Sequence, residues 1–410
     1  MALFVTIAPE HHAGRPNKRN RLVLFLLLFA MAASVWQCVR FQVEELEQNT
    51  LISLPVVQST DNTTAGIVSD SIRIQQNQNV YFGWPDQALV SADRIFLRDS
   101  QRNAILVFDA GDTRMSAVVL PRNSSPGALT DIQKVQLPPG QVGAMVTNPV
   151  AKLICFGLYQ KDKALPQYRS TWPAGSPAAR PIATGSMIEQ HGQRFHCLDE
   201  NLEVRYTLAN DDQGDEGLFY AVKSVFMDNT GRISLWHSEW TNHNQWQERL
   251  SILKPGSATI HVNLDASHFT EPGIGNRDNL AIETVMTAPE GDSITVALSR
   301  RSKSSYEMEN KFFYHLVAPD YKARLILQSD DPNDYFACTM PSDGLRILNS
   351  SEDGTSLLIK TYNKEAEYLK NERIRLDGIR AAWQDVWCEP GGSFYTSRLF
   401  RGQYSIHAWR

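Results

Sequence analysis

The sequence predicts an all-β fold that follows one N-terminal transmembrane helix. Residues 22–39 form an uncharged, mostly apolar stretch, and from about Asn79 onward short apolar or alternating runs are separated by turn residues. The 410 residues are 42% hydrophobic and 21% charged, with a formal net charge of −5. This composition predicts a folded chain with a substantial core, and it shows no basic surplus for binding nucleic acid.

The segment 22–39, LVLFLLLFAMAASVWQCV, is long enough to cross a bilayer, because a helix of this length spans roughly 27 Å. Basic residues concentrate before it and acidic residues after it, and this asymmetry predicts a cytoplasmic N-terminus. We therefore expect a basic head over 1–21, a transmembrane helix or signal anchor over 22–39 and an exported remainder. The flanking charges are Arg15, Lys18, Arg19 and Arg21 on one side and Glu44, Glu45 and Glu47 on the other.

Two alternatives remain for this segment. Ala30-Met31-Ala32 has the small-x-small form that signal peptidase accepts, so the segment could be a cleaved signal and the protein secreted. A buried helix of a soluble protein is the third interpretation. Residues 40–78 are polar and lack a sustained period, which predicts a linker or stalk before an extracytoplasmic domain over 79–410.

Internal repetition sharpens the prediction for residues 79–410. Four segments, beginning at Ala151, Gly231, Asp292 and Thr355, each read as an apolar strand, a polar hairpin tip and a second strand, with a turn sequence before them. Taking Leu153, Ile233, Ile294 and Leu357 as markers, the spacings are 80, 61 and 63 residues. A weaker copy begins at Asn103. The C-terminal SFYTSRLFRGQYSIHAW predicts two more strands, which would complete the blade begun near Asn79.

Antiparallel units of about sixty residues cannot bury both faces alone, so they are expected to pack sheet on sheet around an axis. This predicts a β-propeller of about 5–7 blades, with a pair of β-sandwiches as the alternative. The segments SSEDGTSLLIK and FMDNTGRISLW resemble the turn and strand of TolB-like and other WD-type propeller repeats. The spacings exceed the usual length of about 40–45 residues, and Gly-His and Trp-Asp signatures are missing. The resemblance therefore implies the architecture and no functional residue.

The exported part contains four cysteines. Cys197 and Cys338 each lie 44 residues after a marker, in similar contexts, which predicts equivalent positions on different blades. A bridge between them would contradict the propeller, because bridging needs Cα atoms within about 7 Å. Cys155 lies among apolar neighbours and is expected to be a core residue. We expect no disulfide or one at most, and the absence of Cys-x-x-Cys argues against zinc or thioredoxin-like chemistry.

The most unusual composition is the segment from Trp236 to Trp246, WHSEWTNHNQW. Aromatic faces beside amides and carboxylates suit a sugar ring or a peptide. In the repeat alignment the same side chains could instead pack between sheets, and the alignment favours this packing. The candidate binding surface comprises Trp240, His243, Trp246, Tyr306 and Tyr368.

No other motif predicts chemistry. The acidic runs NDDQGDEG from Asn210 and SDDPNDY from Ser329 could offer oxygen ligands, but neither fits a twelve-residue calcium loop, and solvated loops are the favoured interpretation. We therefore predict no cofactor and no metal. Asn62, Asn123 and Asn349 lie in Asn-x-Ser/Thr patterns that matter only in a host that glycosylates exported proteins.

These observations predict a membrane-tethered, extracytoplasmic propeller that acts as a non-catalytic binding or scaffold module for a protein, glycan or envelope partner. The alternative is an exported carbohydrate-active enzyme, a glycoside hydrolase or lyase whose carboxylates come from different blades. Two carboxylates in the central funnel would favour the enzyme, and an apolar lining would count against it.

Overall fold

The computed structural model describes the chain from Val43 to Arg410 with internal gaps. The longer gaps are 60–70, 77–79, 83–86, 123–131 except Ser124, 162–190, 211–216, 241–245, 265–279 except Phe269, 302–307 and 377–382. Shorter gaps are 92, 100–101, 292, 342–343, 352–354, 389–391 and 401–402. The predicted head and transmembrane segment over 1–39 therefore lie outside the described residues. Within the described residues, no helix is long and apolar enough to cross a membrane.

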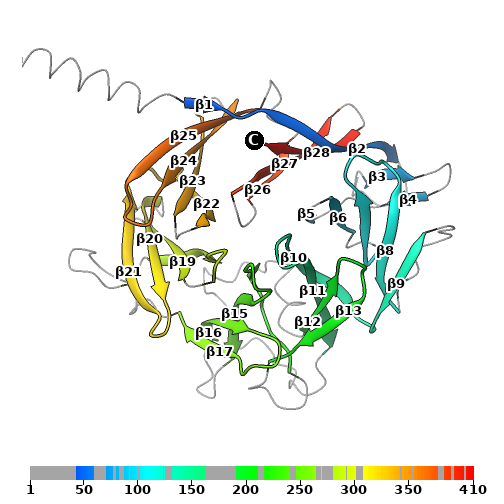
Figure 1. The fold of residues 1–410 in the computed structure, drawn as a ribbon, viewed down its shortest axis with the longest axis horizontal. Helices are drawn as coiled ribbons and strands as arrows, with labels where there is room; N and C mark the ends of the chain where they lie inside the picture. The colour runs from blue at the N-terminus through cyan, green and yellow to red at the C-terminus, as the bar shows by residue number, and fades with distance from the viewer. Residues whose placement is uncertain are drawn as a thin grey trace, which may run out of the picture.

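The described strands form six sheets arranged in a ring, each with its first strand nearest the axis (Figure 1). Three sheets have four antiparallel strands in sequence order. Blade II contains β10 (Gln141–Asn148), β11 (Leu153–Lys161), β12 (His191–Asp199) and β13 (Val204–Leu208). Blade III contains β14 (Ser224–Met227), β15 (Ile233–Trp240), β16 (Trp246–Leu253) and β17 (Ile260–Asn263). Blade IV contains β18 (Leu280–Thr287), β19 (Ser293–Arg301), β20 (Met308–Val317) and β21 (Lys322–Ser329).

The other three blades carry additional strands at their outer edges. Blade I contains β5 (Gln87–Ser91), β6 (Arg94–Asp99), β7 (Ala104–Asp109), β8 (Met115–Pro121) and the parallel β9 (Gln133–Leu137). Blade V contains β22 (Tyr335–Thr339), β23 (Leu345–Ser350), β24 (Ser356–Tyr362), β25 (Tyr368–Arg375) and the parallel β1 (Val43–Glu45). Blade VI contains β26 (Trp383–Cys388), β27 (Phe394–Phe400), β28 (Gln403–Trp409), β2 (Gln48–Ser59), β3 (Ser71–Gln76) and β4 (Val80–Phe82). The chain is a six-bladed β-propeller, not a pair of sandwiches.

The ring closes through pairing of the two ends of the domain. The strand β2 pairs antiparallel with β28 from Gln48↔Trp409 to Pro55↔Gln403 and is the fourth strand of blade VI. This differs from the sequence-based expectation, in which residues 40–78 are a linker and the last strands complete a blade begun near Asn79. The strand is hard to recognise from its sequence because polar residues are frequent around it and its pairing partner, β28, lies at the far end of the chain. Its side chains Ile52 and Leu54 are buried in the cluster between blades VI and I.

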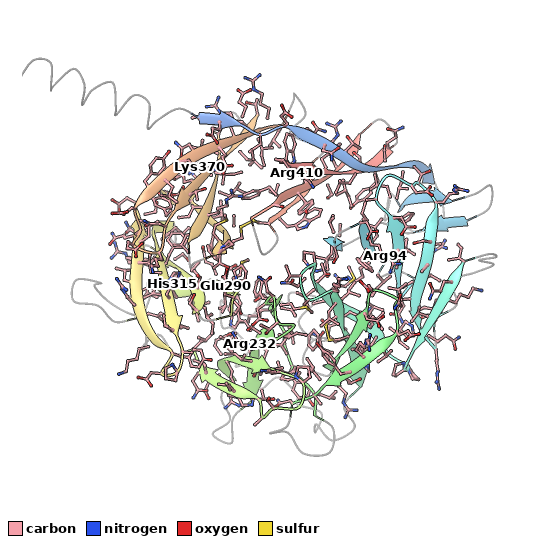
Figure 2. All side chains as sticks on the ribbon, viewed as in Figure 1. Arg94, Arg232, Glu290, His315, Lys370 and Arg410 are labelled. Atoms are coloured by element: carbon pink, nitrogen blue, oxygen red, sulfur yellow. A yellow bond between two sulfur atoms is a disulfide. The ribbon has the colours of Figure 1, made fainter. Side chains whose placement is uncertain are left out.

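The core of the described residues consists of six apolar clusters, one between each pair of neighbouring blades. Successive side chains on a strand point to opposite faces of its sheet, so one strand supplies two clusters. In β11, for example, Phe156 packs toward blade I and Cys155 toward blade III. Side chains fill the spaces between blades (Figure 2). This explains why strands such as AILVF are apolar at every position.

The repeat markers are not all equivalent. Leu153, Ile233 and Ile294 lie in the second strands of blades II, III and IV, but Leu357 lies in β24, the third strand of blade V. The 63-residue spacing therefore does not measure a blade. Antiparallel hairpins share the same signature of apolar strand and Asp/Gly turn, so sequence similarity cannot identify which pair of strands a hairpin joins. The predicted turns themselves do require positive φ, with Gly231 at 81° and Gly291 at 79°.

The disulfide expectation is wrong. Cys155 and Cys197 form a bridge between adjacent strands of blade II, and Cys338 and Cys388 join β22 of blade V to β26 of blade VI. Cys155 and Cys197 are register partners in the antiparallel β11–β12 pairing, at a sequence separation of 42. Cys197 is on a third strand and Cys338 on an inner strand. Their shared 44-residue offset is therefore not structural equivalence.

Candidate functional site

A central channel runs where the six innermost strands converge. The cavity measures about 410 Å³ and is lined by residues from β5, β10, β14, β18, β22 and β26. Every blade thus contributes to one wall, as expected for a propeller axis. The described lining residues are Gln87, Ala88, Leu89, Met145, Val146, Thr147, Val225, Phe226, Met227, Thr284, Met286, Phe336, Ala337, Val386, Trp387 and Cys388.

None of these described lining residues carries a charge, and most are apolar. Phe226 and Met286 are partly exposed and belong to none of the inter-blade clusters, so their side chains are available at the channel. Trp387 stacks on Tyr395 with ring centroids 5.6 Å apart. Among the described residues, no protein atom accepts a hydrogen bond from the buried Trp387 indole N–H. The wall therefore suits an uncharged, apolar occupant.

Two described carboxylates next to the lining in sequence are already engaged. Asp228 follows Met227 and lies 2.8 Å from the Arg232 guanidinium. Glu283 precedes Thr284, and both of its carboxylate oxygens accept hydrogen bonds of 2.6 Å from the Lys311 ammonium. Lys311 is almost fully buried, and its ammonium also lies 4.9 Å from the Tyr335 ring centroid. Such a buried cation holds its carboxylate in place, so Glu283 is structural in this arrangement.

Specific links fix the inner strands relative to one another. The Gln87 side-chain amide joins blades I and II, because it donates to the Met145 carbonyl at 2.8 Å and accepts from the Met145 N–H at 3.0 Å. The Asn148 amide donates to the Met227 carbonyl at 3.1 Å, joining blades II and III. The remaining links are Asn229 N–H to the Pro289 carbonyl, Thr339 hydroxyl to the Thr287 carbonyl, and the Cys338–Cys388 disulfide. The channel is therefore a preorganised cavity.

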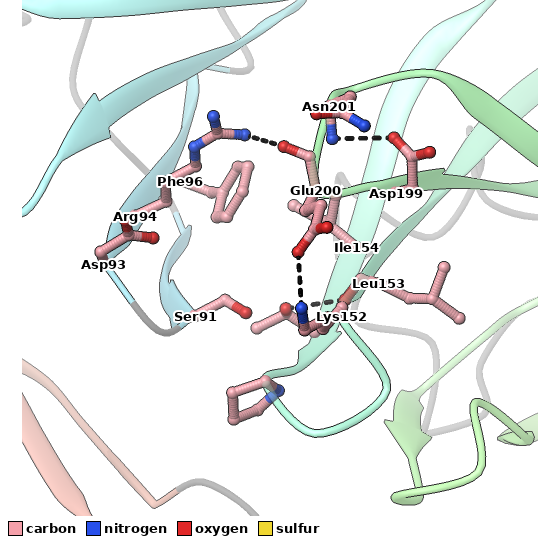
Figure 3. A pocket seen from close by; sticks show the side chains of 12 residues that line it. Ser91, Asp93, Arg94, Phe96, Lys152, Leu153, Ile154, Asp199, Glu200 and Asn201 are labelled. Atoms are coloured by element: carbon pink, nitrogen blue, oxygen red, sulfur yellow. Dashed lines mark hydrogen bonds and ion pairs between the residues drawn. The ribbon is translucent and has the colours of Figure 1, made fainter.

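A second cavity of about 430 Å³ lies between blades I and II, and Figure 3 shows it from close by. Arg94 donates to the Glu200 carbonyl, and the Lys152 ammonium lies 3.0 Å from the Glu200 carboxylate. Burial alone would raise the pKa of Asp199, but backbone N–H donors and the Arg205 guanidinium, 2.7 Å away, lower it. Basic side chains therefore compensate the carboxylates of Asp199 and Glu200, and Asp93 lines the same crevice.

A third cavity of about 340 Å³ lies between blades III and IV and explains part of the aromatic segment. Trp236 is 6% exposed, and its indole N–H donates to Glu248 at 2.7 Å. Lys223 pairs with the same carboxylate and lies 4.8 Å from the Trp236 ring centroid. Trp236 is therefore a core residue with a satisfied polar group, as the packing alternative predicts.

The candidate surface residues are only partly placed. Trp240 and Trp246 are register partners at the end of the β15–β16 hairpin. His243 and Tyr306 lie outside the described residues. Tyr368 begins β25, where its ring lies 5.9 Å from Tyr362. Because β15–β16 joins second and third strands whereas β24–β25 joins third and fourth strands, these hairpins lie on opposite faces of the ring. The structure therefore does not gather Tyr368 with the two tryptophans.

The described part of the second acidic run has a structural role. The Asp334 carboxylate accepts hydrogen bonds from Ser329 at 2.6 Å, Asn349 at 2.7 Å and Lys360 at 2.8 Å. The other acidic run, residues 211–216, lies outside the described residues. Among the residues that the structure describes, no group of three or more His, Cys, Asp or Glu side chains could hold a metal ion.

No family model matches the chain, and no curated protein matches it. Solved structures that resemble it include a prolyl endopeptidase (9% identity, TM-score 0.39, covering 82% of this chain and 46% of that one). Others are the Pyrococcus horikoshii acylaminoacyl peptidase (11%, TM-score 0.43, 86% and 49%) and TolB from Acinetobacter baumannii (10%, TM-score 0.35, 78% and 65%). The chain spans about half the length of the two peptidases, at 46% and 49%. At these identities and TM-scores the likenesses carry no argument about function.

Proposed function

We propose that the protein is a membrane-tethered, extracytoplasmic β-propeller that acts as a non-catalytic binding or scaffold module for a protein or envelope partner. The observation that carries this proposal is the uncharged, mostly apolar lining of the central channel. A hydrolase of the alternative class needs two carboxylates about 5–10 Å apart at its reacting centre. The described channel wall supplies none, and Glu283 beside it is held by Lys311.

The binding role follows from the chemistry of the wall. A cavity of this size, apolar and fixed by inter-blade links, fits an apolar side chain or short uncharged segment of a partner protein. At the channel, Phe226 offers an aromatic contact surface and Met286 a flexible one that can adapt to its partner. The tether follows from the uncharged stretch at 22–39 and the basic flank before it.

Site-specific photocrosslinking in the native host tests the binding role. A photoreactive amino acid replaces Phe226 or Met286 in the full chain, and Gln136, exposed on β9 at the rim of blade I, is the matched control. We expect one adduct of the same mass from both channel positions and none from Gln136. Absence of an adduct from a folded, membrane-bound protein would contradict the binding role. Release of reducing ends from polysaccharides by the purified protein would establish the hydrolase alternative instead.

The tether has a separate test. Alkaline carbonate extraction of membranes should leave the full chain in the pellet, and mass spectrometry of that protein should detect peptides from residues 1–42. A soluble protein whose N-terminus begins near Ala33 would show that the segment is a cleaved signal.

A further inference from the structure

One face of the ring carries two kinds of turn and, at blade VI, the C-terminal end of β28 beside the start of β2. Neighbouring strands of each blade run in opposite directions, so turns between first and second strands and between third and fourth strands emerge on the same side. We call this side the short-turn face. Its described turns include 149–152, 200–203, 254–259, 318–321 and 363–367. The crevice in Figure 3 opens on it, where the turns around Asp93, Lys152 and Glu200 meet.

Exposed apolar side chains concentrate on this face. Among the described residues, six large apolar side chains are exposed, and five of them lie in or next to these turns. The sixth, Tyr335, begins an inner strand and lies on the opposite face with 47% exposure. The five are between 47% and 66% exposed: Val150, Val204, Ile260, Val317 and Leu369.

Several exposed charges on the short-turn face form local ion pairs. Lys152 lies 3.0 Å from Glu200, and Lys322 lies 3.7 Å from Asp320. Arg114 and Asp112 in blade I form a similar exposed pair at 3.5 Å. An approaching surface therefore meets apolar side chains among neutralised charges, without a field of one sign.

The described chain begins close to one of these turns. Val43 is the register partner of Asn371 in β25, and the Glu44 carboxylate lies 3.6 Å from the Lys370 ammonium. Leu369 is therefore next to the point where the chain enters the ring. Only residues 40–42 separate Val43 from the predicted membrane segment at 22–39. Three residues allow a separation of about 14 Å at full extension.

We propose that the short-turn face rests on the lipid bilayer that holds the segment 22–39. This inference rests on the proposed tether. A linker of this length keeps the rim of blade V at the membrane surface. Because the protein is already anchored, each further contact with the bilayer forms at a high effective concentration. Each aliphatic side chain alone binds the membrane weakly, but several that enter the headgroup boundary together add their binding free energies. A phospholipid surface fits because the face combines exposed aliphatic side chains with ion pairs of both signs.

An edge-on orientation is the competing arrangement, and the ring geometry separates the two. Blade II lies across the ring from blade V in Figure 1, and Lys370 lies on the blade V side in Figure 2. If only the rim of blade V met the bilayer, Val150 and Val204 of blade II would be far from it. If the short-turn face lies flat, they meet the bilayer together with Leu369.

The experiment uses the full chain with Cys38→Ser in phosphatidylcholine vesicles, with both disulfides intact. A fluorophore is attached to Val150→Cys, Val204→Cys or Leu369→Cys, and to Tyr335→Cys as the equally exposed control on the opposite face. Lipids with a nitroxide at the headgroup boundary serve as quenchers. We expect about twofold quenching at the first three positions and none at Tyr335→Cys, unchanged by added salt because the interaction is apolar.

Each other outcome contradicts the proposal in a distinguishable way. Quenching at Leu369→Cys alone would show an edge-on ring, and quenching at Tyr335→Cys would show the opposite face on the membrane. No quenching in a protein that resists alkaline extraction would leave the tether intact and overturn only the docking face. Release of the protein by alkaline extraction would overturn the tether and this inference together.

Discussion

Gln48 and Trp409 are register partners, so the second described strand of the chain pairs with its last strand. The pairing makes blade VI from both ends of the domain, and it buries Ile52 and Leu54 against blade I. Blade VI is therefore incomplete, and the ring open, until the last strands of the chain are in place. Stability of the ring depends on a segment that, by composition alone, resembles a linker.

Replacing Leu54 tests this closure. Leu54 is fully buried, so Leu54→Ala should lower the free energy of unfolding by about 2–5 kcal/mol through lost apolar burial and a residual cavity. Leu369→Ala, at a position that is 53% exposed, is the matched control and should change it by about 0.5 kcal/mol or less. Urea unfolding in detergent measures both. Equal effects of the two substitutions would contradict closure by β2.

The disulfides provide a covalent test of the blade assignment. Non-reducing peptide mass spectrometry should find Cys155 linked to Cys197 and Cys338 linked to Cys388. Loss of the first bridge in a Cys155→Ser/Cys197→Ser variant should destabilise the protein by about 4 kcal/mol in the chain-entropy model, because the bridge closes a loop of 42 residues. Cys38→Ser should leave stability unchanged. Free thiols at Cys155 and Cys197 in the exported protein would contradict the structure.

Acidification should destabilise the propeller through buried imidazoles. Burial, together with nearby His261, lowers the pKa of His237 from 6.5 to about 4, and burial lowers that of His407 to about 4 as well. Between pH 4 and pH 6.5 each of these imidazoles is protonated in the unfolded chain but neutral in the native state. Stability is therefore retained above about pH 6.5 and falls progressively toward pH 4. For His237 the loss at pH 5 is about 2 kcal/mol.

Urea unfolding at pH 7 and pH 5 measures this loss. Within the sheet, the Ser251 hydroxyl lies 2.7 Å from both His237 Nε2 and His261 Nδ1, so His237→Gln keeps a hydrogen-bonding group at the site. The variant should show a smaller difference between the two pH values than the wild type. Lys134→Gln, at an exposed position, should keep the wild-type difference. An unchanged pH dependence in His237→Gln would show that other groups carry the acid sensitivity.

Of the three Asn-x-Ser/Thr patterns, the structure decides the one at Asn349. Its side-chain amide nitrogen donates to Asp331 and Asp334, at 2.7 Å in each case. A glycan would occupy this nitrogen, so we expect no modification at Asn349 in a glycosylating host, as read by peptide mass spectrometry. Finding a glycan there on folded protein would contradict this network.

The same network predicts that a negative charge at position 349 lowers the stability of the protein strongly. Asn349→Asp removes two donors and places a third carboxylate beside Asp331 and Asp334, which should cost about 2 kcal/mol or more. Asn363→Asp is the solvent-exposed control. The Asn363 oxygen accepts backbone N–H bonds from Glu365 and Glu367, which a carboxylate can also do, and its amide donates to the Glu367 carboxylate at 2.9 Å. Because that amide bond is exposed, its loss and the added charge should cost less than at Asn349. Urea midpoints of the two variants decide the comparison.

Sequence patterns predicted the propeller but not which strands of a blade each hairpin joins. Alternating apolar runs and Asp/Gly turns identify hairpins, and the local turn geometry at Gly231 and Gly291 agrees with them. They cannot tell a hairpin of second and third strands from one of third and fourth strands, because both are antiparallel. For this reason the repeat alignment equates the hairpin of Leu357 and Tyr368 with those of blades III and IV, although it joins third and fourth strands. Tyr368 therefore lies on the opposite face of the ring from Trp240 and Trp246.

The channel wall had no sequence signature. Phe226 and Met286 lie on short inner strands that resemble any half-buried strand, and only the convergence of six blades places them around one cavity. The one available signal was position, since each lies just before a turn that leads into a second strand. The disulfide at Cys338–Cys388 was equally hidden, because it joins two blades through their inner strands.

The sequence by itself determined the β-rich composition, the hairpins and their turns, because these depend on contacts between neighbours in the chain. It also predicts the export segment, since hydrophobic length and flanking charge are local properties. Tertiary structure alone decided the six-blade count, the closure of the ring by β2, both disulfides and the face that carries Leu369 and Val204. These features depend on pairing between distant segments, and a repeating antiparallel pattern offers many equivalent partners until the complete ring selects one.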